Sequence, residues 1–185
     1  MINILDDVEW SPQVIMLGKG PSAALRESVL ASYPNALLVT LNHAIRWSDG
    51  RETWAHYVDV EAMEECKDYN VLYATFLLLP TIMNIGSHRA KERVRPTEHP
   101  AIFYDRDDVG LRYFSAEGAL GALGWLGYER VLLCGVDGGV GYAPGLEDVA
   151  HRHLENGRAS FDIQWKQLET IKERYSMEVY RVALE

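Results

Sequence analysis

The chain has few of the features that mark secreted or membrane proteins. Its 185 residues include only two cysteines, Cys66 and Cys134, too few for a disulfide framework and compatible with buried free thiols in a reducing compartment. No segment is apolar for long enough to span a bilayer, because the longest apolar run, residues 74–83, is interrupted by Pro80. The first seven residues also lack the basic region and apolar run of a signal peptide. We therefore expect a cytoplasmic protein without a transmembrane segment.

Positive charge is also in short supply. The chain carries 18 lysines and arginines against 27 aspartates and glutamates, which gives a net charge of −9 at pH 7. Proteins that bind duplex nucleic acid broadly need a basic face that displaces counterions, so the composition argues against a nucleic-acid partner. It does not argue against a small anionic ligand, since a local pocket can oppose the sign of the whole protein.

What the sequence does contain is an alternation of apolar, β-prone runs with helical patterns. We expect strands at residues 13–18, 35–42, 54–60, 71–79, 101–104, 130–137 and 178–183. We expect helices at residues 22–33, 115–126 and 161–175, the last behind a cap at Ser160. This alternation favours an α/β fold in which helices cover both faces of a mostly parallel sheet. The length suits a single domain over residues 1–185.

Two segments carry more specific expectations. The run at 130–137 is apolar almost throughout, as in a central parallel strand that is covered on both faces. Residues 84–98 are basic and polar, and they predict either a surface helix followed by a loop or a flap.

The strongest local signal is the turn Gly18-Lys19-Gly20-Pro21-Ser22, between the first strand and the first helix. Glycines allow a tight turn and a close approach to a ligand, and proline suits the first position of a helix. The Ser22 hydroxyl would lie beside unpaired N–H groups at the helix start, which is a natural site for phosphate or carboxylate. The alternative is a tight turn that holds no ligand. Its place at the carboxyl end of a first strand favours the ligand. We therefore expect exposed main-chain amides at residues 18–22 that bind an anion in the same crevice as Asn42 and Ser115.

Two further strands are expected to end at the same edge. Asn42 follows one of them, and its side-chain amide can both donate to and accept from a base or a sugar. Asp59 and Glu61 end the next, where two carboxylates could hold a divalent cation. Alternatively, Asp59 bonds a ribose hydroxyl, or Glu61 merely begins a helix. The metal site is the weakest of these alternatives.

A second glycine-bearing helix begins at Ser115. This residue and the main-chain amides near Gly118 could meet a second part of the ligand. Gly118, Gly121 and Gly124 recur at intervals of three, and this spacing predicts close packing of the helix on the sheet.

A flexible loop follows the strand at 130–137. Glycines next to a strand end are common hinges of active-site loops, and Tyr142 in this loop could donate a hydrogen bond to a leaving phosphate. His151 and His153 come next, and either could act as a general base near neutral pH. An ordinary solvated histidine is the simpler interpretation of each.

Several segments together resemble the small bacterial sialyltransferases that act on lipooligosaccharide. The segments are V-I-M-L-G-K-G-P-S from residue 14, L-V-T-L-N from residue 38, S-A-E-G-A-L-G-A-L-G-W-L-G-Y-E-R-V-L-L-C-G-V-D from residue 115, and L-E-T-I-K-E-R-Y-S-M-E-V-Y from residue 168. That family runs from a strand into G-N-G-P-S, has a second strand ending near asparagine, and has S-G…A…A-L-G-Y before a strand ending G-I-D. A family of archaeal hydroxymethyl-dihydropterin diphosphokinases shares the G-x-G-P-S turn.

The resemblance implies a Rossmann-like fold that binds a CMP-linked nucleotide-sugar across the strand carboxyl ends and transfers the sugar, without a metal and with inversion, to a hydroxyl of a glycan acceptor. It places His153, or less securely His151, as the base. Tyr142 would replace a tyrosine that the family has where this chain has glycines 138 and 139. The residues predicted to bind the nucleotide are Gly18, Lys19, Gly20, Pro21, Ser22, Asn42, Asp59, Ser115, Gly118 and Asp137. Among them, Lys19 and Asp59 stand where the family has asparagines.

Two alternatives stay open at this stage. A phosphoryl transferase of the diphosphokinase type would need Mg²⁺ between the phosphates, and Asp59, Glu61 and Asp137 would then become ligands. A catalytically silent nucleotide-binding protein would keep the fold without the family's tyrosines. The sequence leaves the donor sugar, the acceptor and the formation of a homo-oligomer open.

Overall fold

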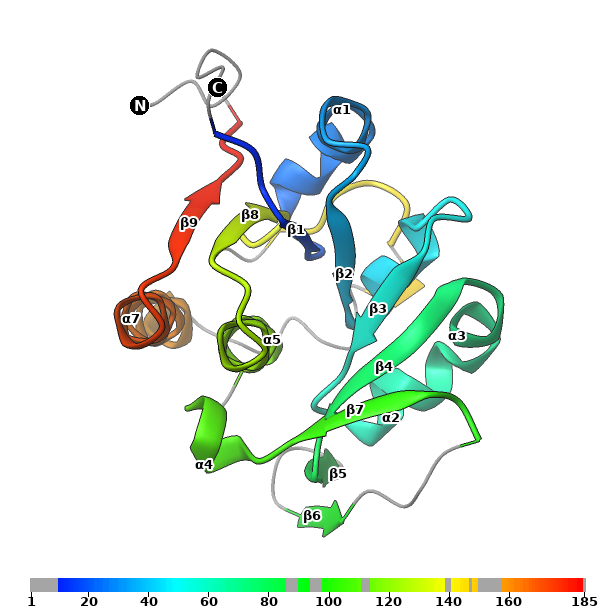
Figure 1. The fold of residues 1–185 in the computed structure, drawn as a ribbon. Helices are drawn as coiled ribbons and strands as arrows, with labels where there is room; N and C mark the ends of the chain where they lie inside the picture. Colours follow the sequence, from blue (N-terminus) through cyan, green and yellow to red (C-terminus); the bar gives the residue numbers. More distant parts are fainter. Residues whose placement is uncertain are drawn as a thin grey trace.

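The computed structural model describes residues 10–85, 90–93, 98–110, 114–138, 141–146, 148–149 and 158–184 (Figure 1). The strands are β1 (Val14–Leu17), β2 (Leu37–Leu41), β3 (Thr53–His56), β4 (Ala74–Pro80), β5 (Ile82–Ile85), β6 (Ala90–Arg93), β7 (Ala101–Tyr104), β8 (Arg130–Cys134) and β9 (Glu178–Arg181). The α-helices are α1 (Arg26–Ser32), α2 (Val60–Glu65), α3 (Lys67–Tyr73), α4 (Arg106–Val109), α5 (Ser115–Trp125) and α7 (Arg158–Arg174). Two 3-10 helices, η1 (Pro21–Leu25) and η2 (Asn42–Trp47), follow β1 and β2.

Seven strands form one parallel sheet in the order β7-β4-β3-β2-β1-β8-β9. From β1 the chain first builds β2, β3, β4 and β7 outward on one side, and then adds β8 and β9 on the other side. The order therefore reverses between β1 and β8. In open parallel sheets, ligands bind outside the carboxyl ends of the strands at such a reversal.

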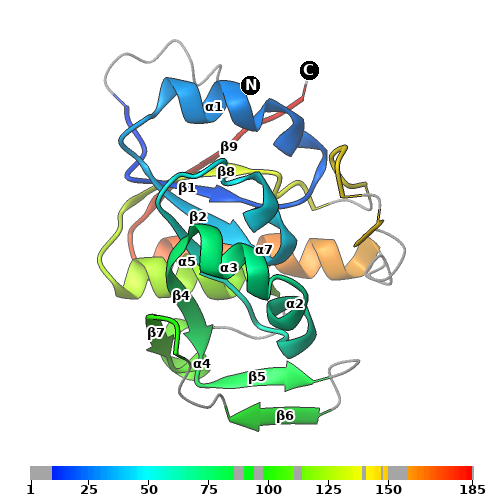
Figure 2. The ribbon, with the colours of Figure 1, turned by 90° about the vertical axis from the view of Figure 1, so that its right-hand side faces the viewer.

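Helices cover both faces of the sheet, as the sequence predicts (Figures 1 and 2). Helices α5 and α7 lie on one face, and α1, α2 and α3 lie on the other. Strand β1 is buried on both sides: Met16 packs in the cluster with Leu120 of α5, whereas Leu17 packs with Leu30 of α1. Because both faces are buried, the parallel strands have apolar sequences without alternation. Among the described residues, no helix has the length and apolar character needed to cross a membrane.

Three expectations about individual elements are wrong. Residues 71–73 belong to α3, and β4 begins only at Ala74. Val71 and Leu72 have strand-like side chains but are 77% and 68% exposed on the helix, so the local sequence preference misleads there. Strand β8 is parallel to both neighbours and buried on both faces as expected, but it lies second from the edge of the sheet, and β2 takes the centre. Helix α7 starts at Arg158, so Ser160 lies inside the helix and does not precede it as a cap.

The expectation of a surface helix in the basic segment after β4 is wrong over its described residues, and the alternative of a mobile flap stays a prediction. Strands β5 and β6 form an antiparallel pair, and no helix occurs in the described residues there. Met83 of β5 is buried with the core cluster of β3 and β4, and Asn84 makes an isolated bridge to Asp59. The buried methionine fixes this hairpin against the carboxyl end of β3. The polar composition of the segment does not predict this contact.

Candidate functional site

The turn after β1 is held against the turn after β8 by main-chain hydrogen bonds. The amide of Gly18 donates to the carbonyl of Cys134 at 2.7 Å, and the amide of Gly20 donates to the carbonyl of Gly135 at 2.8 Å. The amide of Ser22 donates to Oδ2 of Asp137 at 2.9 Å. Pro21 has no N–H group. The prediction of unpaired amides at Gly18, Gly20 and Ser22 is therefore wrong, because the protein itself supplies their acceptors.

The hydroxyl of Ser22 is also committed to the fold. Ser22 is buried, and its Oγ accepts a hydrogen bond from the amide of Gly135 at 2.8 Å. The sulfur of Cys134 in turn lies 3.5 Å from the carbonyl oxygen of Ser22. Ser22 thus joins the two turns at the point where the strand order reverses, and its hydroxyl lies inside the protein.

The same contacts explain why the turn contains glycines. A Cβ atom on Gly18 would lie 2.3 Å from the carbonyl oxygen of Gly135, and one on Gly20 would lie 2.2 Å from Oδ2 of Asp137. Any side chain at either position would overlap the neighbouring turn. The glycine signal that the sequence suggested for a ligand is accounted for by close contact between two parts of the backbone.

Asn42 and Ser115, in contrast, lie together at the carboxyl edge of the sheet. Asn42 follows β2 and has a left-handed backbone, with φ of +53°, and Ser115 is the first residue of α5. Ser115 Oγ donates to Asn42 Oδ1 at 3.3 Å. Non-glycine residues with positive φ are uncommon, and asparagine is among the few that tolerate it. Both residues were selected from the sequence as ligand contacts, and the structure brings them into contact with each other.

The first turn of α5 is otherwise tied into the helix. The amide of Gly118 donates to the carbonyl of Phe114 at 3.1 Å, so it bonds within the helix. Glu117 is buried, and its Oε1 accepts from the amide of Phe114 at 3.0 Å. Gly121 and Gly124 permit close packing, but their neighbours are Val109 of α4 and Tyr175 rather than the sheet.

Lys19 follows β1 at the same edge of the sheet, within reach of the charges of a group of polar side chains. Its Nζ lies 4.9 Å from the centre of the Tyr142 ring. Burial lowers the pKa of Lys19 to about 8, although Cys66, Asp59 and Glu65 nearby act in the opposite direction. These three residues come from the end of β3 and from the end of α2. Lys19 is thus a desolvated amine at the place where parallel sheets bind ligands.

A histidine that the sequence gave no reason to select belongs to this group. His43 follows Asn42 in η2 and is 1% exposed. Its Nε2 lies 2.8 Å from Oε2 of Glu65, and burial lowers its pKa to about 4. His43 is therefore neutral at pH 7. It and Glu65 are 22 positions apart, and no local pattern links them.

Asp59 precedes α2, and Glu61 lies in the first turn of this helix, which is one of the alternatives that the sequence left open for Glu61. Oδ1 of Asp59 accepts from Nδ2 of Asn84 at 3.0 Å, and Oδ1 of Asn84 accepts from Arg106 at 3.0 Å. This chain fixes the Asp59 carboxylate against the β5–β6 hairpin. Among the described residues, no group of three or more histidine, cysteine, aspartate or glutamate side chains could hold a metal ion.

The loop after β8 is fastened to the turn after β1. The amide of Ala143 donates to the carbonyl of Lys19 at 2.9 Å, which keeps Tyr142 next to the lysine. Gly138 has φ of +64° and lies directly beneath the indole of Trp165 in α7. His151, His153 and Gly139 lie outside the described residues.

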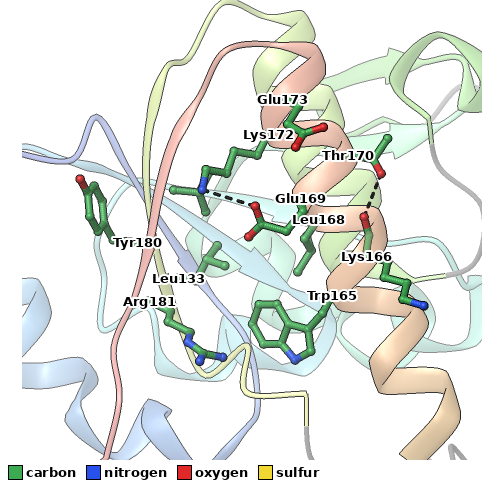
Figure 3. A pocket seen from close by; sticks show the side chains of 11 residues that line it. Leu133, Trp165, Lys166, Leu168, Glu169, Thr170, Lys172, Glu173, Tyr180 and Arg181 are labelled. Carbon is green, nitrogen blue, oxygen red and sulfur yellow. Dashed lines mark hydrogen bonds and ion pairs between the residues drawn. The ribbon is translucent and has the colours of Figure 1, made fainter. Parts of the chain in front are cut away.

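A cavity of about 650 Å³ lies elsewhere, between α7 and β9 (Figure 3). Leu133 and Leu168 line it, and the guanidinium carbon of Arg181 lies 5.0 Å from the centre of the Trp165 ring. None of the residues predicted from the sequence lines this cavity. Its walls are side chains of α7 and of an edge strand, and it lies away from the carboxyl ends of β1, β2 and β3.

Comparisons of the chain with protein-family models, with curated proteins and with solved structures found no match. The resemblance to sialyltransferases accordingly rests on the sequence motifs alone. The geometry of the carboxyl edge has to carry the functional argument.

Proposed function

We propose that the protein is a glycosyltransferase-like enzyme that binds a nucleotide-activated sugar at the carboxyl edge of its parallel sheet. The observation that carries the proposal is the meeting of Asn42 and Ser115. These residues lie 73 positions apart, and both were selected from the sequence as ligand contacts. They come together at the edge where parallel sheets bind nucleotides.

The proposed phosphate contacts differ from those that the sequence suggested. The amides of the turn after β1 have protein acceptors, so we assign the phosphate to the side-chain amide of Asn42, which the Ser115 hydroxyl orients, and to the start of α5. The first turn of an α-helix directs main-chain N–H groups outward, and the helix dipole favours a negative charge there. The side chain of asparagine supplies two N–H donors, and a phosphate oxygen readily accepts a hydrogen bond from either of them.

The expected chemistry follows from the nature of glycosyl transfer. The transition state resembles an oxocarbenium ion, so the protein has to stabilise a leaving phosphate and position one base for the acceptor hydroxyl. Tyr142 is the tyrosine that we assign to the leaving phosphate. This assignment requires no metal ion.

The binding test is a thermal-shift screen with CMP, CDP, AMP and ATP, each with and without Mg²⁺. A ligand at a hundred times its dissociation constant should stabilise the folded protein by about 2.7 kcal/mol. Stabilisation by cytidine nucleotides without a metal supports the proposal. Stabilisation only by adenine nucleotides with Mg²⁺ would favour the phosphoryl transferase instead.

Matched variants then locate the binding site. Ser115→Ala removes the hydroxyl that meets Asn42, and Ser32→Ala removes an exposed hydroxyl that bonds only within α1. We expect Ser115→Ala to reduce the nucleotide-induced shift and Ser32→Ala to leave it unchanged. Equal shifts in both variants would contradict the site. Release of free sugar from a CMP-linked donor, with transfer to an added glycan, tests the reaction itself.

A further inference from the structure

The cavity between α7 and β9 is separate from the proposed nucleotide site. Its volume is about 650 Å³, and pockets that bind small molecules usually measure about 300–1,000 Å³. Strand β9 is the last strand of the sheet, and no strand of the described residues pairs with its outer side. The cavity therefore borders an edge of the sheet from which a small molecule can enter.

The cavity is lined by one face of each element. Trp165 and Leu168 of α7 are three positions apart, and Lys172 follows four positions later, so the three share one face of the helix. Val179 and Arg181 of β9 are two positions apart, so both lie on the face of the sheet that α7 covers. Figure 3 shows that Trp165, Lys172 and Arg181 extend into the space between the helix and the strand.

The two ends of the cavity differ in charge (Figure 3). At one end, Nζ of Lys172 lies 3.4 Å from Oε2 of Glu169, so this cation has a carboxylate partner. At the other end, Arg181 stacks on Trp165, and no carboxylate of the described residues forms an ion pair with it. Stacking leaves the N–H groups around the guanidinium available as donors. This end is therefore positive in a chain whose net charge is −9.

The space between the two ends is apolar. Leu133 and Leu168 belong to the core cluster on this face of the sheet, and Val179 and the half-buried Trp165 pack against it. All four side chains line the cavity. A ligand with an apolar body would remove their remaining exposed surface from water, which favours binding.

We propose that this cavity binds a small organic carboxylate with an apolar body. The planar fork of the Arg181 guanidinium matches the two oxygens of a carboxylate, and the apolar body packs against Trp165 and Leu133. A nucleotide fits less well, because its sugar hydroxyls would lie against the apolar middle of the cavity, where they lack hydrogen-bond partners. The inference does not depend on the proposed function.

The first test compares phenylbutyrate with phenylbutanol, its neutral analogue. Binding is followed through the indole N–H resonance of Trp165 in ¹⁵N-labelled protein, which is assigned by its absence in Trp165→Phe. We expect phenylbutyrate to shift this resonance saturably, with a dissociation constant of about 1 mM or below for a ligand of this size. Phenylbutanol should bind about 10-fold more weakly, since it lacks the charge-assisted hydrogen bonds. Equal binding of the two, or no saturable shift with phenylbutyrate, would overturn the inference.

The second test uses two matched arginines. Arg174 is also exposed and stacks on an aromatic ring, that of Tyr175 at 5.3 Å, but it does not line the cavity. Arg181→Gln should weaken the binding of phenylbutyrate by about 10-fold and leave phenylbutanol binding unchanged. Arg174→Gln should bind both like the wild type. Wild-type affinity in Arg181→Gln, or an equal loss in both variants, would contradict the assignment.

A third variant fills the cavity. Val179→Phe keeps a residue that suits a strand and places a ring where the ligand would lie, so phenylbutyrate binding should be lost while thermal unfolding stays cooperative. Continued binding would place the ligand elsewhere and overturn the inference.

CMP distinguishes this inference from the proposed function. If CMP and not phenylbutyrate shifts the Trp165 resonance, and Arg181→Gln abolishes that shift, the cavity binds the nucleotide and the carboxylate inference is wrong. If phenylbutyrate binds here as expected while no nucleotide stabilises the protein, the proposed function fails and this inference stands.

Discussion

The Asp137 carboxylate accepts a hydrogen bond from the main-chain amide of Ser22 at 2.9 Å. It thereby takes the place beside the start of η1 that a phosphate was expected to fill. The carboxylate comes from the turn after β8, so the bond also joins the two strands between which the order of the sheet reverses.

The first prediction concerns this bond. Asp137→Ala should lower the free energy of unfolding by about 1–2 kcal/mol, because loss of a side-chain acceptor at a helix start has a cost of that order. Asp137→Asn should lower it less, since the asparagine side chain keeps an acceptor oxygen. Urea denaturation of the three proteins measures the difference. Wild-type stability in Asp137→Ala would mean that the bond contributes nothing.

The second prediction concerns the glycines of the turn after β1. Gly18→Ala should destabilise the protein by about 2–3 kcal/mol, because the new Cβ would lie 2.3 Å from the carbonyl oxygen of Gly135 and overpacking has such costs. Gly50→Ala is the comparison: Gly50 has φ of +74° and no neighbour within 4 Å of the added atom. It should cost only the conformational penalty of about 1–2 kcal/mol. Thermal unfolding measures the stability of both variants. If Gly50→Ala were less stable than Gly18→Ala, this explanation would be wrong.

The third prediction separates the backbone of Asn42 from its side chain. Asn42→Gly keeps access to a φ of +53° and should leave stability within about 1 kcal/mol of the wild type, while the nucleotide-induced shift is lost. Asn42→Val should lower the free energy of unfolding by about 1–2 kcal/mol, since a left-handed backbone is costly for a β-branched residue. Denaturation with and without CMP measures both effects. Full nucleotide binding by Asn42→Gly would remove this side chain from the site.

The fourth prediction concerns the acid stability of the core. His56 ends β3, is fully buried, and bonds through Nε2 to Tyr104 Oη at 2.7 Å. Burial, helped by the charge of Arg106, lowers the pKa of His56 to about 3. Between about pH 6.5 and 3 the unfolded chain therefore binds a proton that the folded protein excludes. Since the unfolded state binds more protons in this window, the free energy of unfolding falls as the pH falls.

His56→Gln should remove this part of the pH dependence. The slope contributed by the histidine approaches 1.4 kcal/mol per pH unit within the window, and the variant should lose less stability than the wild type between pH 7 and pH 4. His43, whose pKa is also lowered by burial, acts in the same direction in both proteins. Urea denaturation at several pH values measures the slopes, and parallel curves would show that folding does not lower the pKa of His56.

Much of the fold could be predicted because its signals are local. Each parallel strand buried on both faces is an apolar run, and each helix repeats apolar residues at helical spacing. Errors arose where local preference and tertiary position disagree. Val71 and Leu72 read as a strand but lie exposed on α3, and the polar segment after β4 contains a strand because Met83 is buried there.

The candidate site was only partly predictable from the sequence. Glycines in a turn indicate that another group approaches the backbone closely, but they do not show whether that group is a ligand or another part of the protein. Gly18 and Gly20 marked a close approach correctly, but the approaching atoms belong to Gly135 and Asp137. Asn42 and Ser115 were each selected correctly as residues of this edge: Asn42 follows a parallel strand, and Ser115 begins a helix.

By itself, the sequence determined the α/β class, the parallel strands and the edge at which polar residues gather. Only the tertiary structure decided that Asp137 binds the amide of Ser22, that His43 pairs with Glu65, and that Lys19 lies beside Tyr142. Periodicity along the chain records which face of an element is buried. It does not indicate which distant residue a side chain contacts, because that contact depends on how whole elements pack together.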